Sequence, residues 1–222
     1  NDEHPTVVSI DVPSGMFGDW NPQKVNRNIM HATLTLAIQF PRISFFIADN
    51  AELIGEWKVL DIGLSEAAIA ATPASFSLVE KRDVHRRLRH RKEFASKADF
   101  GSAVLYAGSY GMMGAAVLAA RGALRAGVGK LTVNAPKWGN IILQTAVPEA
   151  LYRYNRGEQN IVEIHPERDF KAVAIGPGIG TNELTVKALE DFLASANQPV
   201  VLDADALNCI ALKPAMLNTI PV

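Results

Sequence analysis

The sequence predicts an α/β protein built on parallel sheets, a three-layer sandwich in which helices cover both faces of a sheet. Two observations lead to this prediction. From residue 100 onward, short apolar runs of strand length alternate with segments of helix length, and this alternation is typical of parallel sheets with crossover helices. Several of these runs end in glycines or carboxylates, which open α/β sheets place beyond their strands to bind ligands.

The second part of the chain carries the clearest elements. Each expected strand is a run of apolar residues that ends in glycine, asparagine or aspartate, and each expected helix begins a few residues later. We expect strands at residues 103–108, 130–135, 172–176 and 200–205, and helices at 113–126, 183–196 and 206–212.

The first part of the chain predicts a separate sheet region. We expect strands at residues 6–11, 32–40, 43–48 and 55–64. A small, polar stretch follows, so we place a domain boundary there, with domains at residues 1–72 and 73–222. The chain opens on a strand that nothing covers and ends soon after residue 212, so we expect it to be a piece of a longer protein.

Composition excludes several function classes. The formal net charge of −1 provides no field that would attract nucleic acid or an anionic membrane, and no apolar run is long enough to span a bilayer. The first residues have no signal-peptide pattern. A single cysteine, Cys209, excludes an intrachain disulfide and is expected to pack as a small apolar residue. These features favour a reducing, cytoplasmic location.

Residues 81–92 (KRDVHRRLRHRK) form a basic run that holds seven of the 22 Lys and Arg residues. Such a run usually forms a solvated helix face or a linker, and this interpretation is favoured. A contact with a nucleotide phosphate or with another subunit is the alternative.

Two glycine-rich loops are candidate binding elements. Gly108, Gly111 and Gly114 join a strand to an Ala-rich helix, but their spacing is not the dinucleotide fingerprint, so either a tight turn or a binding loop is consistent with it. Residues 176–180 (GPGIG) are more specific, because a proline stiffens the loop while three glycines leave backbone amides open to a ligand.

Carboxylates at strand ends are the second group of candidates. Asp203 and Asp205 follow an apolar strand, where carboxylates need a hydroxyl, a metal or helix amides as partners. Asp205 is equally well explained as the N-cap of the next helix, so Asp203 is the better functional candidate. Asp11 has the same position in the first part, beside Ser14, and a simple Asx turn is its alternative explanation.

Several motifs in order along the chain resemble a known family. Residues 6–64, with VVSIDVPSG, ATLTLAIQFP and a strand ending in DIG, resemble the C-terminal part of the NAD(P)HX epimerase domain. Residues 78–212 resemble the N-terminal part of the ADP- or ATP-dependent NAD(P)HX dehydratase domain. The second resemblance is carried by FGSAVLYAGSYGMMGAAVLAARGALRAGVGKLTV, Pro148-Glu149, IGPGIG and VVLDADALN. The fused order is similar to that of the bifunctional nicotinamide-nucleotide repair enzymes.

The resemblance implies both a fold and a reaction. It implies a Rossmann-like first domain that epimerises the R and S hydrates of NADH and NADPH. It also implies a ribokinase-like second domain that dehydrates the S hydrate at the expense of a nucleotide phosphoryl group. The implied ligands are NADHX or NADPHX, an adenine nucleotide (ADP or ATP), Mg²⁺ and K⁺, and the implied assembly is a homo-oligomer.

The resemblance also implies roles for individual residues. In the first domain, Asp11 corresponds to a substrate-contacting acidic residue and Ser14 to a potassium ligand. In the second domain, the implied substrate-binding positions are Ala115, Gly178, Asp203, Asp205 and Asn208. The catalytic base is expected beyond Val222, as are other loops of the family, so we expect this chain alone to catalyse neither reaction.

Two other functions remain open at this point. A ribokinase-like kinase for a small-molecule hydroxyl would share the second domain but has no need of residues 6–64. A non-catalytic binding or assembly module would use exposed sheet edges, which favour association.

Overall fold

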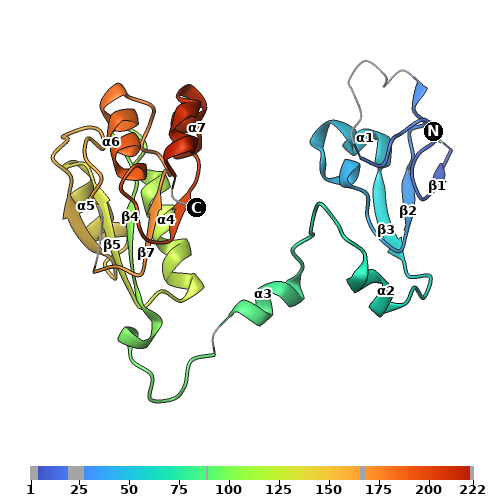
Figure 1. The fold of residues 1–222 in the computed structure, drawn as a ribbon, viewed down its shortest axis with the longest axis horizontal. Coiled ribbons are helices and arrows are strands. Elements are labelled where there is room, and N and C mark those ends of the chain that lie inside the picture. Colours follow the sequence, from blue (N-terminus) through green and yellow to red (C-terminus); the bar gives the residue numbers. More distant parts are fainter. Residues whose placement is uncertain (1–4, 20–27, 89, 166–168, 221–222) are drawn as a thin grey trace. The chain divides into compact units, whose positions relative to one another are not determined.

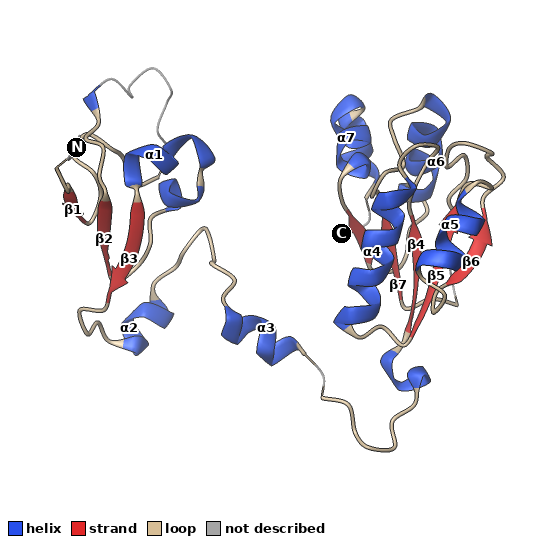
Figure 2. Cartoon of the chain, turned by 180° about the vertical axis from the view of Figure 1, so that it is seen from behind, coloured by secondary structure: helices blue, strands red, loops and turns tan. Residues whose placement is uncertain are grey.

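The computed structural model of the protein describes residues 5–19, 28–88, 90–165 and 169–220. The chain divides into two compact units, Asn1–Val79 and Glu80–Val222, and each is described by itself (Figure 1, Figure 2). The sequence placed the domain boundary at residue 72, whereas the contacts within each unit place it between Val79 and Glu80. Among the helices that the structure describes, none is long and apolar enough to cross a membrane.

The first unit contains a three-stranded parallel sheet in the order β1, β2, β3. These strands are β1 (Val8–Ile10), β2 (Leu34–Ile38) and β3 (Glu56–Leu60), and each lies within a segment where the sequence predicts a strand. Two short helices, α1 (Ala51–Ile54) and α2 (Glu66–Ala71), precede and follow β3.

The prediction of a strand at residues 43–48 is wrong. The chain forms two 3₁₀ turns there, Ile43–Phe46 and Ala48–Asn50, which lead into α1. The reason is topological, because β2 and β3 are parallel neighbours and the chain must return between them by a crossover. The apolar residues of the segment serve this crossover, since the Phe45 side chain is buried in the core of the unit.

The second unit contains a five-stranded sheet in the order β6, β5, β4, β7, β8, and every neighbouring pair is parallel. Four of the five strands lie where the sequence predicts them. The exception is β6, a short edge strand of exposed and half-buried residues that has no run of buried apolar side chains to reveal it. In chain order, the strands are β4 (Ser102–Tyr106), β5 (Lys130–Ala135), β6 (Leu151–Tyr154), β7 (Ala172–Ile175) and β8 (Val200–Leu202).

Helices cover both faces of this sheet, as the predicted three-layer sandwich requires (Figure 2). Successive residues of a strand point to opposite faces, so in β4 Tyr106 packs in the core with α6 and α7, whereas Leu105 packs with α4 and α5. The helices are α3 (Lys81–Arg87), which precedes the sheet, then α4 (Met113–Ala126), α5 (Gly139–Ala146), α6 (Glu183–Leu193) and α7 (Asp205–Leu212).

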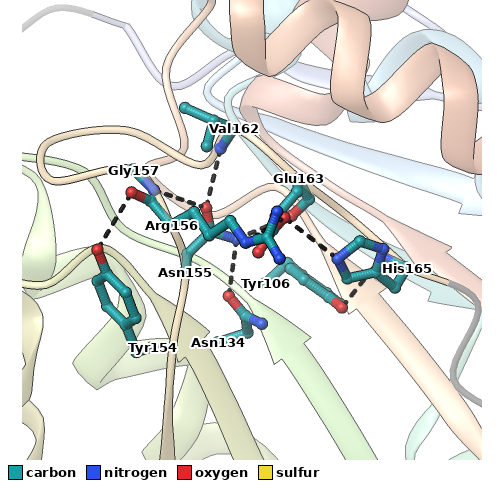
Figure 3. Close-up of polar contacts among 9 residues, drawn as sticks. All are labelled: Tyr106, Asn134, Tyr154, Asn155, Arg156, Gly157, Val162, Glu163 and His165. Carbon is teal, nitrogen blue, oxygen red and sulfur yellow. Dashed lines mark hydrogen bonds and ion pairs between the residues drawn. The ribbon is translucent and has the colours of Figure 1, made fainter.

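A polar loop at residues 155–165 is fastened to the sheet by Asn155, which is fully buried (Figure 3). Asn155 Nδ2 donates to Asn134 Oδ1 of β5 at 2.9 Å and to the Glu163 carbonyl at 2.8 Å. Asn155 Oδ1 accepts from the Val162 amide at 3.0 Å. Both polar atoms of the Asn155 side chain are therefore bonded, and this side chain fastens the loop to β5.

The charged groups of this loop lie farther out. The Glu163 carboxylate lies 3.5 Å from Arg156 Nε and 3.3 Å from His165 Nε2 (Figure 3). The His165 amide donates to the hydroxyl of Tyr106, a fully buried residue of the central strand, at 3.3 Å. The loop is thus tied to β4 as well as to β5.

We expect Asn155→Ala to destabilise the second unit by about 2–4 kcal/mol, because it removes several hydrogen bonds and leaves buried partners unsatisfied. Urea unfolding followed by circular dichroism measures this difference. The matched control is Asn140→Ala on α5, where the side chain is exposed and a change below about 0.5 kcal/mol is expected. Equal effects of the two substitutions would contradict the anchoring role.

Candidate functional site

The candidate site lies at the carboxyl ends of β4, β7 and β8, where three loops meet. Open α/β sheets bind ligands beyond these strand ends. The loops are residues 107–112, residues 176–180, which we call the glycine loop, and residues 203–204. The glycine loop lies between the other two and touches both.

Close backbone contact requires glycine at two positions of the glycine loop. A Cβ atom on Gly176 would lie 1.8 Å from the Asp203 carbonyl oxygen, and one on Gly178 would lie 2.8 Å from the carbonyl oxygen of Met112. Both glycines also have positive φ angles, 139° and 68°, which favour glycine over residues with a side chain. The packing of the loop, besides any contact with a ligand, therefore accounts for its glycines.

Ala115 and Gly178, two predicted binding residues, lie side by side. A Cβ on Gly178 would lie 2.9 Å from the Ala115 Cβ, so only two small residues fit there. Ser109, which the sequence analysis did not single out, holds this contact in place. Its buried hydroxyl donates to the Gly178 carbonyl at 2.8 Å, and the Gly108 amide donates to the Pro177 carbonyl at 2.8 Å.

The structure supports the tight-turn alternative for part of the loop at residues 107–112, and the binding-loop alternative stays a prediction. Gly108 is a packing residue, because a Cβ there would lie 2.6 Å from Met113 Sδ. Gly111 and Gly114 face open space, with nothing within 4 Å of an added Cβ. Helix α4 begins here, and its N-cap residue Met112 makes no side-chain cap. The start of α4 therefore presents backbone amides, with the exposed Met112 side chain lying beside the glycine loop.

Asp205 is not the N-cap of α7, so that alternative is wrong. The N-cap is Ala204, and Asp205 lies in the first turn. The Asp205 carboxylate instead accepts from the Gly180 amide at 2.9 Å and from Asn208 Nδ2 at 3.1 Å. Both predicted site residues thus hold the start of α7 against the glycine loop, and the Gly180 amide is not open to a ligand as the sequence suggested.

Asp203 differs from Asp205 because its carboxylate is exposed and bonds to no other residue that the structure describes. Its backbone is fixed, since the Asp203 amide donates to the Ile175 carbonyl and its carbonyl accepts from the Ala206 amide. The next residue, Ala204, has a φ of 47°, a strained conformation of a kind that clusters at functional sites. Asp203 is therefore a free carboxylate on a fixed backbone.

Cys209 packs as the sequence predicts. Its side chain is fully buried, and its thiol donates to the Gly180 carbonyl at 3.5 Å. Burial raises the pKa of the Cys209 thiol, and the nearby Asp205 carboxylate raises it further. The thiol is therefore protonated at neutral pH and is a packing group rather than a nucleophile.

In the first unit, the candidate residues lie directly after β1. Asp11 has a φ of 67°, and both of its carboxylate oxygens lie 2.8 Å from Nη2 of Arg42, a partner that the sequence analysis missed. This ion pair replaces the Asx turn that was its alternative explanation. Ser14 is exposed, and its carbonyl accepts from the Met30 amide. The structure thus places Asp11 and Ser14 in one turn.

No cluster of three or more His, Cys, Asp or Glu residues suited to a metal occurs in the described part of the chain. The candidate ligands of any bound cation are therefore single groups, such as the Ser14 hydroxyl or the Asp203 carboxylate. Hydroxyl and carboxylate oxygens suit hard cations such as potassium and magnesium.

Comparisons with known proteins agree with this architecture. The NAD(P)H-hydrate dehydratase family model matches residues 103–220. The bifunctional NAD(P)H-hydrate repair enzyme Nnr of Moorella thermoacetica is 29% identical over 226 residues, covering 98% of this chain and 42% of that protein. The ADP-dependent (S)-NAD(P)H-hydrate dehydratase of Bacillus subtilis is 37% identical over 124 residues, covering 56% of this chain and 44% of the relative.

A solved structure extends the comparison to the fold. A ribokinase-like superfamily protein of Enterococcus faecalis is similar with a TM-score of 0.52 and 23% identity, covering 61% of this chain and 48% of that chain. This likeness shows a ribokinase-like fold for the second unit. The chain spans less than half the length of the curated relatives it matches. The family model covers more than half of this chain, and the chain therefore belongs to the NAD(P)H-hydrate dehydratase family.

Proposed function

We propose that the protein carrying this chain repairs hydrated NADH and NADPH by nucleotide-dependent dehydration of the S hydrate. The observation that carries this proposal is the contact between Ala115 and Gly178 at the carboxyl edge of the sheet. The start of α4, the Met112 side chain and the exposed Asp203 carboxylate belong to the same site. The names of the relatives support the choice of substrate.

The proposed reaction makes a poor leaving group into a good one. Transfer of a phosphoryl group from the nucleotide to the ring hydroxyl gives a phosphate ester. Loss of phosphate, together with a proton from the adjacent ring carbon, then restores the dihydronicotinamide. We propose ADP or ATP as the donor, with Mg²⁺ to neutralise the phosphates.

The residues of the site would bind and orient the substrate. Backbone amides at the start of α4 suit phosphate oxygens of the dinucleotide, because helix N-termini bind anions. The Asp203 carboxylate suits a hydroxyl donor of the substrate, whereas Asp205 and Asn208 would position the glycine loop rather than contact the ligand. We assign the catalytic base to none of these residues.

We propose a second activity for the first unit, as part of an epimerase that interconverts the R and S hydrates. Relatives named as bifunctional repair enzymes match nearly the whole chain, including this unit. Asp11 would contact the substrate, and Arg42 would orient its carboxylate. Ser14 would supply one oxygen ligand to K⁺.

We also propose that the protein works in the cytoplasm as a homo-oligomer. The reduced, buried Cys209 fits a reducing compartment. Leu151 on β6 and Val201 on β8 are both more than half exposed on the edge strands of the second unit, and exposed apolar edges favour association.

The proposed dehydration is tested by mixing the full-length protein with (S)-NADHX, Mg²⁺ and either ADP or ATP, and following the absorbance of regenerated NADH. Asp203→Asn is expected to raise KM about tenfold through loss of one charged hydrogen bond. Leu207→Ala, at an exposed side chain of α7, is the control and should leave KM unchanged. No NADH with either nucleotide would refute the proposed reaction.

Asp11→Asn tests the proposed epimerase role. We expect it to lower the epimerisation rate at least about tenfold while the free energy of unfolding changes by less than about 1 kcal/mol. The stability effect is small because the ion pair with Arg42 is more than a third exposed on each side. Chromatographic separation of the R and S hydrates measures the rate. Unchanged epimerisation would contradict the assignment.

A further inference from the structure

The second unit has a basic groove at the amino ends of its strands, which we define by Arg87, Arg91 and Lys171. Its volume is about 650 Å³, and its lining includes the residues just before β4 and β7 and the C-terminal end of α4. All strands of this sheet are parallel. The groove at their amino ends and the glycine loop at their carboxyl ends therefore lie at opposite ends of the strands. The proposed dehydration makes no use of it.

The three cations of the basic groove have no acidic partner among the residues that the structure describes. Among the described residues that line the groove, Asp99 is the one carboxylate, and it already accepts hydrogen bonds. Asp99 Oδ2 accepts from the Ser96 amide at 2.7 Å and from the Ser96 hydroxyl at 3.1 Å. By contrast, Arg42, Arg156 and Lys213 all pair with carboxylates. Three cations beside one carboxylate leave a net positive charge in the groove, and a bound anion would relieve the repulsion among them.

Arg91 is held in place within the groove. Its guanidinium lies 4.5 Å from the centre of the Phe100 ring, and Nη2 donates to the Gly127 carbonyl at 3.4 Å. A guanidinium has five N–H donors, so most of its donors remain available. Arginine held by an aromatic ring binds phosphate with less loss of side-chain freedom than a mobile lysine.

An aromatic side chain lies in a neighbouring hollow of about 470 Å³. Phe94 lines it and is 94% exposed, although burial is the usual state of phenylalanine. This hollow shares Asp99 and Phe100 with the basic groove. An anion that carries a planar ring could therefore stack its ring on Phe94 while its phosphates reach the cations.

We propose that the basic groove binds a phosphoryl anion, either free polyphosphate or the phosphate groups of a nucleotide. Three cations around one hollow suit the multiple oxygens of a polyphosphate better than a single carboxylate. A nucleotide-phosphate contact was the alternative interpretation of the basic run at residues 81–92. We assign that contact to Arg87 and Arg91, and Lys171, which is distant in sequence, lines the same groove.

Isothermal titration of the 222-residue chain with inorganic pyrophosphate and, separately, with ADP tests the proposal. We expect pyrophosphate to bind, and Lys171→Ala and Arg87→Ala each to weaken that binding about fivefold or more. Arg91→Lys keeps the charge but loses the fork of donors, and is expected to weaken it as well. Lys58→Ala on β3 removes the same charge from the other unit and should have no effect. Thermal unfolding checks that each variant is folded.

The outcomes separate the possible ligands from each other and from the glycine-loop site. Tighter binding of ADP than of pyrophosphate, with the difference removed by Phe94→Ala, would identify a nucleotide site. Equal binding would identify a free polyphosphate site. Asp203→Asn should leave pyrophosphate affinity unchanged in both cases. Absence of pyrophosphate binding, or binding that persists in the Arg87 and Lys171 variants, would overturn the proposal.

Discussion

The second unit depends on the close fit of the glycine loop between its two neighbours. Gly176 lies against the backbone after β8, and Gly178 lies against the backbone before α4. Any side chain at either position would collide with a carbonyl oxygen, so the loops that follow the three strands pack closely, with only the Ala115 and Met112 side chains beside Gly178. The Ser109 hydroxyl bonds to the Gly178 carbonyl, and the Asp205 carboxylate accepts from the Gly180 amide, so both side chains hold the glycine loop in place. The result is a preformed arrangement of three loops.

This constraint explains which residues are left to bind a ligand. Polar groups that hold the glycine loop in place form hydrogen bonds within the protein and are not open to a ligand, as the bonds of Asp205 and Asn208 show. Asp203 is free because its backbone, rather than its side chain, makes the structural contacts. At the amino ends of the same strands, Arg87, Arg91 and Lys171 have no acidic partner among the residues that the structure describes. The carboxyl ends of the strands therefore offer a ligand backbone amides and a carboxylate, whereas the amino ends offer cations.

Much of this architecture could be predicted from the sequence, because it depends on local signals. Helix α4 and strand β5 have the predicted bounds, since apolar periodicity and flanking glycines mark their ends. Features that depend on distant partners could not be predicted. The pair of Asp11 with Arg42 spans 31 residues, and the bond from Ser109 to Gly178 spans 69. The helical turns at residues 43–50 were hidden because tertiary topology overrode an apolar, strand-like pattern.

The central claim is that hydrated dinucleotide binds at the glycine loop, and the most direct measurement is amide chemical-shift mapping by NMR. The chain would be titrated with (S)-NADPHX in the absence of nucleotide. The account predicts that the amide signals of Ala115 and Gly178 shift together, and that these shifts persist when Arg87→Ala and Lys171→Ala remove cations of the basic groove. Unchanged signals at Ala115 and Gly178, with shifts elsewhere in the second unit, would contradict it.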